Sequence, residues 1–463
     1  MDAVAAWTAL LRPERELTPE FTLWLADAMR QRKLTFGDRV HCPVLRPFFL
    51  TAADETRIRT ASETIADIGE RVVAAAMADA GLLAALGVTE AEARLIGIDP
   101  GYARASTASR LDAFLLPDSL HFAEYNAESP AGPAYTQGLC ELFDALEPMT
   151  ALRRDFAVTY HRTIPPLLAA LLDSYRDWGG TASPPTVAIV DFRGVPTWTE
   201  FELLQDAFVE AGVPTLVCDP RELTFEGGVL RAEGRRIDLV YRRVLLNDIL
   251  ARPDDCASLV AAYEQRAVCV ANTFRCKLPH KKAFFAVLTD PAFASLMSGG
   301  ERAIVQAHVP WTRLVADVKT DRGGTMTPLL EAARRDRDRL VLKPNDEYGG
   351  TGVMLGWEAS EAVWDAGLQR ALADPPGTWV LQERIPVTRE VFPHFDEQGR
   401  VTMRDMLVDL APYLFRGKLA GYLTRLSTTG LANVTSGGGQ VPAFVVGEEP
   451  LSGSLSRAER ADG

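Results

Sequence analysis

The stretch SRLDAFLLPDSLHFAEYN, residues 109–126, sets carboxylate side chains among the apolar residues of two short runs. The segment 117–119 between the runs has the Pro, Asp and Ser residues of a turn, so we expect the runs to pair as an antiparallel hairpin. A hairpin centred on this turn brings Asp112 opposite Glu124. Two carboxylates are therefore predicted to lie side by side on one face of a sheet.

The same register adds an arginine and an amide to this face. Arg110 falls opposite Asn126, and side chains two residues apart in a strand project from the same side. Two carboxylates and an amide oxygen suit Mg²⁺, which takes oxygen donors and leaves positions for water and phosphate. The guanidinium of Arg110 could bind a phosphate or an acyl phosphate. The same four residues could instead form a solvated cross-strand cluster, and the hairpin alone does not decide between the two.

Composition bounds the class of protein. The chain has 463 residues, 47% of them apolar, which is enough for two or three domains with their own cores. A formal net charge of -13 argues against a nucleic acid or an anionic membrane as the main partner. The six cysteines stand far apart without zinc-ligand spacing, and neither a signal-like start nor a long apolar run is present. We therefore expect a soluble cytoplasmic protein with reduced thiols.

Periodicity divides the chain into segments of different type. Residues 1–100 carry apolar residues at helical spacing and predict helices. Residues 186–244 alternate apolar strands with an amphipathic helix, a pattern typical of a parallel sheet with crossover helices. The first turn of this layer, DFRGVPTW at 191–198, lacks the G-x-G-x-x-G of a dinucleotide site. A nicotinamide-dependent oxidoreductase is therefore a less favoured alternative.

A glycine-rich turn far along the chain suits phosphate binding. In LVLKPNDEYGGTGV, residues 340–353, Lys343 ends an apolar run and a Gly-Gly-Thr-Gly turn follows. Backbone N–H groups in such a turn, close to a fixed ammonium, can bind phosphate. The lysine precedes the glycines, so this is not a P-loop, and a lone Gly-rich turn is more often an ordinary hairpin loop. The next apolar run, GTWVLQERI, carries Gln382 and Glu383, which could reach a base or a ribose.

Together these segments resemble the circularly permuted ATP-grasp fold of glutathionylspermidine synthase-like enzymes. The hairpin is similar to the R-x-D and E-x-N segments of that family, while LKPNDEYGGTGV and LQERI resemble its nucleotide-binding half. In other ATP-grasp enzymes the metal-ligand strands follow the nucleotide-binding lysines, whereas here they come first. The resemblance covers roughly residues 100–445.

The resemblance implies an α+β fold: a circularly permuted ATP-grasp with a Rossmann-like preATP-grasp domain and a helical N-terminal region. The implied segments are a helical N-terminal region (1–100), the metal-ligand half of the catalytic domain (101–180), the preATP-grasp domain (181–275), the nucleotide-binding portion (276–445) and a disordered tail (446–463).

The functional residues of the family carry over onto matching positions. The implied Mg²⁺ ligands are Asp112, Glu124 and Asn126. The implied phosphate-contacting arginines are Arg110 and Arg425. The implied ATP-binding residues are Lys282, Lys343, Gly349, Gly350, Thr351, Gly352, Gln382 and Glu383. The family has a second phosphate-binding lysine at a helix start before the flap. In FRCKLPHKKAFF, Lys282 is the best match, with Lys277 and Lys281 as alternatives. The Gly/Ser/Thr loop after Arg425, which contains Asn433, could close over the substrate.

The activity implied by the resemblance is that of an ATP-dependent carboxylate–amine ligase. ATP phosphorylates a small-molecule or peptide carboxylate, and an amine attacks the acyl phosphate to give an amide, ADP and phosphate. Such chemistry depends on positioning and charge neutralisation rather than on a protein nucleophile. Arginines such as Arg242 and Arg425 could recognise an anionic acid, although no segment resembles a glutathione site. The alternative is a non-catalytic ATP-binding or scaffold protein of the same fold. The complete set of metal and phosphate residues makes this alternative less favoured than the ligase.

Overall fold

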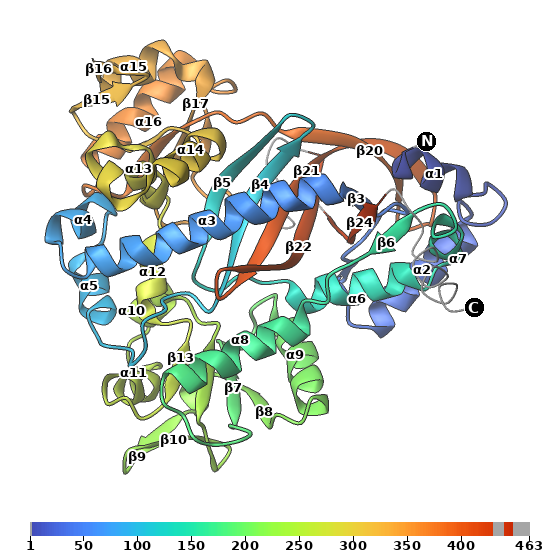
Figure 1. The fold of residues 1–463 in the computed structure, drawn as a ribbon, viewed down its shortest axis with the longest axis horizontal. Helices are drawn as coiled ribbons and strands as arrows, with labels where there is room; N and C mark the ends of the chain where they lie inside the picture. Colours follow the sequence, from blue (N-terminus) through green and yellow to red (C-terminus); the bar gives the residue numbers. More distant parts are fainter. Residues whose placement is uncertain (1, 429–438, 448–463) are drawn as a thin grey trace, which may run out of the picture.

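The computed structural model describes residues 2–428 and 439–447, and its centre is a six-stranded sheet (Figure 1). The strands are β4 (Ala108–Leu116), β5 (Ser119–Asn126), β20 (Thr388–Phe395), β21 (Val401–Phe415), β22 (Lys418–Ser427) and β23 (Gly439–Val441). Their order is β23-β22-β21-β4-β5, and β20 pairs with the first half of β21. A hairpin from the first part of the chain therefore lies beside strands from its end.

The predicted hairpin is present in the predicted register at its functional end. Arg110 pairs with Asn126, and Asp112 pairs with Glu124. A β-bulge next to these pairs leaves Ala123 without an opposite residue and shifts the register toward the turn by one. The expected cross-strand pairs are therefore present only on the side of the bulge away from the turn, where Arg110 and Asp112 lie.

A second, parallel sheet packs beneath the central one (Figure 1). It contains β7 (Val187–Val190), β8 (Thr215–Cys218), β12 (Leu239–Arg242) and β13 (Cys269–Ala271) in the order β13-β12-β7-β8, with all neighbours parallel. Its flanking helices are α8 (Ile164–Asp177), α9 (Trp198–Glu210), α10 (Leu246–Ala251) and α11 (Ala257–Glu264). Nearly every strand residue is buried, because helices and the neighbouring layer cover both faces. The parallel sheet predicted from the apolar runs is confirmed.

A third sheet has a core of its own. It contains β14 (Thr312–Leu314), β17 (Leu340–Pro344), β18 (Met354–Leu355) and β19 (Trp379–Glu383) in the order β14-β19-β17-β18. Leu342 and Leu381 pack there against Trp364 and Leu368 of α16 (Glu361–Ala373). The neighbouring elements are α13 (Ala283–Thr289), α14 (Gly299–His308), β15 (Lys319–Arg322), β16 (Thr325–Pro328) and α15 (Leu329–Arg335).

The N-terminal region is mostly helical, but it also supplies strands. Its elements are α1 (Ala3–Leu10), α2 (Pro19–Gln31), β1 (Thr35–Phe36), β2 (Arg39–Val40), β3 (Phe48–Thr51), α3 (Ala52–Ala76), α4 (Ala80–Ala85) and α5 (Glu90–Ile96). α3 crosses the central sheet (Figure 1). β3 pairs with β24 (Ala443–Gly447), which also pairs with β6 (Ala157–Thr159). A disordered tail from 446 is therefore wrong for residues 446 and 447, and 448–463 lie outside the described residues.

The remaining elements connect these layers. They are α6 (Pro133–Asp144), α7 (Glu147–Leu152), β9 (Thr224–Glu226), β10 (Val229–Ala232), β11 (Arg235–Arg236), α12 (Lys277–His280) and the 3₁₀ turns Pro220–Glu222, Phe274–Cys276, Pro291–Leu296 and Arg337–Arg339. All six cysteines are buried and unpaired. Within residues 2–428 and 439–447, no helix combines the length and the apolar character that crossing a bilayer needs.

Glu128 joins the layers as a buried carboxylate just beyond β5. Its Oε1 accepts from Nη1 of Arg242 at 3.0 Å, and its Oε2 lies 3.4 Å from Nζ of Lys277. Burial alone would raise the pKa of Glu128, but the ammonium and guanidinium beside it hold that pKa at about 2. Glu128 is therefore ionised near neutral pH.

Glu128→Gln is expected to lower the free energy of unfolding by about 3–5 kcal/mol, because it leaves two buried cations short of counter-charge. Urea unfolding at pH 7 measures the change, with Glu141→Gln on the exposed side of α6 as the control. The folded pKa of Glu128 lies below its unfolded value, so its contribution is present above the unfolded pKa and is lost as the pH falls toward 2. The gap between wild type and variant should narrow in acid, and a gap under about 1 kcal/mol at pH 7 contradicts the prediction.

Candidate functional site

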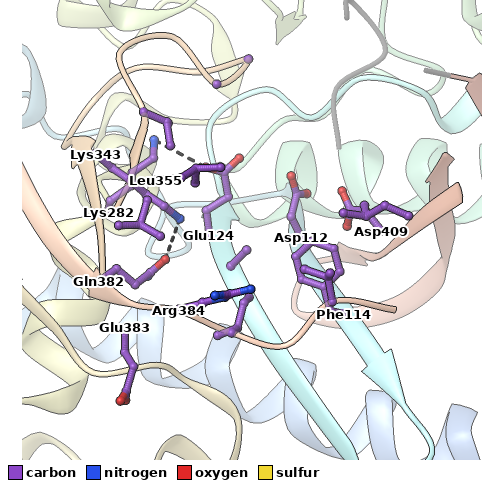
Figure 2. Close-up of a pocket in the computed structure, with 18 of the residues that line it drawn as sticks. Asp112, Phe114, Glu124, Lys282, Lys343, Leu355, Gln382, Glu383, Arg384 and Asp409 are labelled. Carbon is purple, nitrogen blue, oxygen red and sulfur yellow. Dashed lines mark hydrogen bonds and ion pairs between the residues drawn. The ribbon is translucent and has the colours of Figure 1, made fainter. Parts of the chain in front are cut away.

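A cavity of about 330 Å³ lies between the central sheet and the sheet around β19 (Figure 2). The predicted site residues in its lining are Asp112, Glu124, Lys282, Lys343, Gly349, Gly350, Thr351, Gln382, Glu383 and Arg425. They come from segments that are far apart in the chain, between residues 112 and 425, and the fold brings them to one space. Arg110, Asn126 and Gly352 are not part of the lining.

Asp112 is buried between two guanidinium groups. Its Oδ1 accepts from Nε of Arg110 at 2.8 Å, and its Oδ2 accepts from Nη2 of Arg425 at 2.5 Å. Burial would raise the pKa of Asp112, but the two arginines hold it well below its usual range. Asp112 is therefore a carboxylate at neutral pH. Arg110 reaches it from behind the cavity, where its Nη1 also donates to the carbonyl of Ala131 at 3.2 Å.

Asp409 is a site residue that the sequence reasoning missed. It lies on β21 directly opposite Arg425, whose Nε donates to its Oδ2 at 2.8 Å, and its Oδ1 accepts from the backbone N–H of Ala113 at 3.3 Å. Burial raises the pKa of Asp409 to about 7, although Arg425 acts in the opposite direction. The sequence did contain a signal for Asp409. In MLVDLAPYLF, residues 406–415, Asp409 is the one acidic residue of an apolar run, and a strand formed by that run would bury its carboxylate.

Glu124 lies between the carboxylates and the lysines of the cavity (Figure 2). Its Oε2 is 3.5 Å from Nζ of Lys282, and its Oε1 accepts from Nδ2 of Asn126 at 3.2 Å. Asn126 thus supports Glu124 from behind the lining. No group of three or more His, Cys, Asp or Glu side chains in the described parts of the chain is arranged to hold a metal. Two carboxylates and an amide fit Mg²⁺ only if phosphate oxygens or waters complete the shell, which is its usual mode of binding.

Lys343 lies at the end of β17, and its side chain points toward the neighbouring strand β19 of the same sheet. Its Nζ donates to Oε1 of Gln382 at 2.6 Å, and Nε2 of Gln382 donates to Oγ1 of Thr312 at 3.2 Å. Burial lowers the pKa of Lys343 to about 8. The hydrogen bond to Gln382, which Thr312 holds in turn, fixes the orientation of the Lys343 side chain. Glu383 turns away from these groups, and its Oε1 lies 3.5 Å from Nη2 of Arg339 (Figure 2).

The three candidate lysines have different surroundings. Lys277 and Lys281 are almost fully buried and both pair with Asp346, at 2.6 and 3.2 Å. Lys282 lines the cavity and donates to the carbonyl of Glu347. Of the three, Lys282 is the one placed to meet a ligand there.

Residues 344–352, which we call the flap, connect β17 with the segment before β18. Gly349 and Gly350 have φ of 67° and 78° and line the cavity. Gly352 has a different role, because a Cβ there would lie 2.8 Å from Cγ of Pro344 at a φ of +71°. It allows the flap to fold back on itself. The flap tip, residues 348–352, is exposed.

Apolar side chains form much of the remaining lining and could enclose a planar base. Among them are Phe114, Val341, Val353, Leu355, Ile385 and Leu407, and the charged side chains of Glu347, Arg384 and Arg389 also line the cavity. Arg242 is not available to a substrate, which corrects the prediction from the sequence: its side chain is fully buried and paired with Glu128. Asn433 and the Gly/Ser/Thr loop around it lie outside the described residues.

Comparison with known proteins adds a fold and distant relatives. No model of a known protein family matches the sequence. A glutathione synthetase-like effector from Globodera pallida, solved in its apo form, superposes with a TM-score of 0.62 over 92% of this chain and 96% of its own, at 12% identity. The chain shares the fold of this effector.

Curated relatives also match in sequence, among them the following two. A putative glutamate–cysteine ligase of Frankia alni is 25% identical over 337 residues, which are 70% of this chain and 36% of the relative. An uncharacterised protein of Mycobacterium tuberculosis is 24% identical over 226 residues, 46% of this chain and 37% of its own. The chain thus spans little more than a third of the length of these relatives.

Proposed function

We propose that the protein is an ATP-dependent carboxylate–amine ligase with a circularly permuted ATP-grasp fold similar to that of glutathionylspermidine synthases. The observation that carries the proposal is that Glu124 of the early hairpin lies 3.5 Å from Lys282, in a cavity that Asp112 and Lys343 also line. Oxygen donors and ammonium groups, separated by at least a third of the chain, thus face one volume. A nucleoside triphosphate with its metal needs this pairing of charges.

The order of the strands supports the permuted topology. β4 carries Asp112 and pairs with β21, so the predicted metal-ligand hairpin and the last strands form one sheet. In this proposal the parallel sheet of β7, β8, β12 and β13 is the Rossmann-like preATP-grasp domain. The ligase name of the Frankia relative supports the proposed class of activity.

Each side chain has a role in this proposal. Asp112 and Glu124 would hold Mg²⁺, with Asn126 orienting Glu124 from behind the lining, and the bound ion would offset charge on the phosphates. Lys282 and Lys343 bind phosphate oxygens, and the amides of Gly349 and Gly350 cover them from the flap. The apolar walls enclose the adenine. These contacts hold the nucleotide in place and exclude water from an acyl phosphate.

Arg425 is the group nearest to the developing charge. Oδ2 of Asp409 accepts from both Nε and Nη2 of Arg425, and the same Nη2 also donates to Oδ2 of Asp112, so the two carboxylates hold the guanidinium between them. From there it can bind the transferred phosphoryl group or the substrate carboxylate, and no protein nucleophile is required. Arg110 acts behind Asp112 and keeps that carboxylate ionised and oriented. The substrates are a small-molecule or peptide carboxylate and an amine, and a cytoplasmic location stays a prediction.

The test is ADP formation by the purified protein with Mg²⁺, ATP and pooled carboxylates plus amines. The proposal requires ADP release that depends on both pools, with the amide product detected by mass spectrometry. Binding of ATP without turnover in any pool would favour the scaffold alternative. Failure to bind ATP at all would overturn both readings.

A further inference from the structure

A chain of buried charges ties the N-terminal region to the proposed nucleotide site. Glu92 on α5 lies 2.9 Å from Nζ of Lys281, and both side chains are 3% exposed. Lys281 also pairs with Asp346 of the flap, and Asp346 pairs with Lys277. Lys277 in turn lies 3.4 Å from Glu128, just beyond the metal-ligand hairpin. One network therefore contacts the hairpin, the helix before Lys282, the flap and α5.

The flap root, residues 345–347, is attached to the helical segment that carries Lys282. The carbonyl of Asn345 accepts from the backbone N–H of Lys282 at 3.0 Å, and its Oδ1 accepts from the N–H of Ala283 at 2.8 Å. Nζ of Lys282 donates to the carbonyl of Glu347. The position of Lys282 and that of the flap are thus linked.

The segment between α4 and α5 braces the same root from the other side. Nδ2 of Asn345 donates to the carbonyl of Leu86 at 3.0 Å and to that of Gly377 at 2.7 Å. Gly87 has a φ of +70°, and a Cβ there would lie 2.4 Å from the oxygen of Gly377 and 2.5 Å from Nδ2 of Asn345. A backbone approach this close fixes the flap root against the N-terminal region.

We propose that α5 is the brace of the flap root and that Glu92 is a positioning residue, acting through Lys281 and Asp346, which sets the affinity of the site for a nucleotide. This inference rests on the proposed function. Its physical basis is preorganisation: a flap root held in place loses less freedom when the tip closes over phosphates. It assigns a purpose to the N-terminal region that its sequence did not reveal.

Glu92→Gln is the informative variant. Glu92 also closes a capping box with Thr89 at the start of α5, and glutamine serves equally at that position. The substitution therefore keeps the helix cap and removes the charged acceptor that faces Lys281. Glu90→Gln, in the same first turn but exposed, is the matched control.

Two measurements test the proposal. Hydrogen exchange of the amides of residues 345–350, without ligand, should be about tenfold faster in Glu92→Gln than in Glu90→Gln, while exchange within α5 is unchanged. The Kd for Mg²⁺ with the ATP analogue AMP-PNP, by calorimetry, should rise about tenfold, with kcat at saturating ATP within about twofold of wild type. Lys281→Met should behave like Glu92→Gln, and Lys281→Arg should restore most of both values.

A lower melting temperature with unchanged exchange and unchanged Kd would overturn the brace and leave Glu92 a purely structural residue. If the wild-type protein binds no AMP-PNP, the proposed function is wrong, and the exchange rates alone then decide whether α5 holds the flap. If Glu92→Gln does not fold, Glu92→Asp keeps the charge with a shorter reach and should shift both readouts in the same direction by a smaller factor.

Discussion

Asp112→Asn is expected to reduce ADP formation about a thousandfold while the fold persists. Asparagine has the size of aspartate but lacks its negative charge. In the wild-type protein the guanidinium groups of Arg110 and Arg425 keep the Asp112 carboxylate ionised. In the proposed site, an amide at this position would be a weaker ligand for Mg²⁺ and would remove the negative charge that Arg110 and Arg425 share. Turnover with a substrate pair found in the pooled assay gives the number, and circular dichroism checks the fold.

The control for Asp112→Asn is Asp118→Asn, at the exposed turn of the same hairpin, which should stay within about twofold of wild type. Glu124→Gln, opposite Asp112, should lose activity as strongly. Near wild-type rates in either Asp112→Asn or Glu124→Gln would remove the hairpin from the catalytic site.

Lys343→Met is expected to weaken binding of Mg²⁺ with AMP-PNP about a hundredfold, because it removes an ammonium from the buried side of the cavity. Burial lowers the pKa of Lys343 to about 8, so the free protein loses this charge as the pH rises through 8. Wild-type affinity should therefore fall by up to about tenfold for each pH unit above 8. Calorimetry from pH 7 to 9.5 measures both effects.

The control is Lys343→Arg, whose guanidinium stays protonated over the same range and should give a flat profile. Lys319→Met, at an exposed position on β15, should change neither the affinity nor its pH dependence. A wild-type profile that is also flat would show that another group supplies the charge.

The parts of the site that were predictable from the sequence are those fixed by local rules. Turn residues predicted the hairpin, and side chains alternate along each strand, so the common face of Arg110 and Asp112 follows. The turn itself covers only residues 117 and 118, and the bulge at Ala123 is what brings Asp112 opposite Glu124. The bulge at Ala123 was not predictable, since nothing in the local sequence requires it. Apolar runs likewise predicted the parallel sheet without its strand order.

Other features depend on contacts between distant segments, which one sequence does not encode in a readable way. Asp409 belongs to the site only because β21 pairs with both β22 and β4. Lys281 and Lys282 are adjacent in the sequence, but Lys281 pairs with the buried Glu92 whereas Lys282 lines the cavity. Arg242 is a buried partner of Glu128 and not a surface cation. Charged residues whose partners lie far away in the chain were the hardest to assign.

The pairing of β4 with β21 also has a consequence for biosynthesis. As the ribosome delivers the chain, β4 emerges early and its edge stays unpaired until residues 401–415 follow. Pairing across such a distance is slow to form, and an uncovered strand edge invites association with other chains. A nascent or truncated chain that stops before β21 would carry Asp112 and Lys343 yet have no closed site, so the proposed ATP turnover would begin only once β21 has been made and has paired with β4.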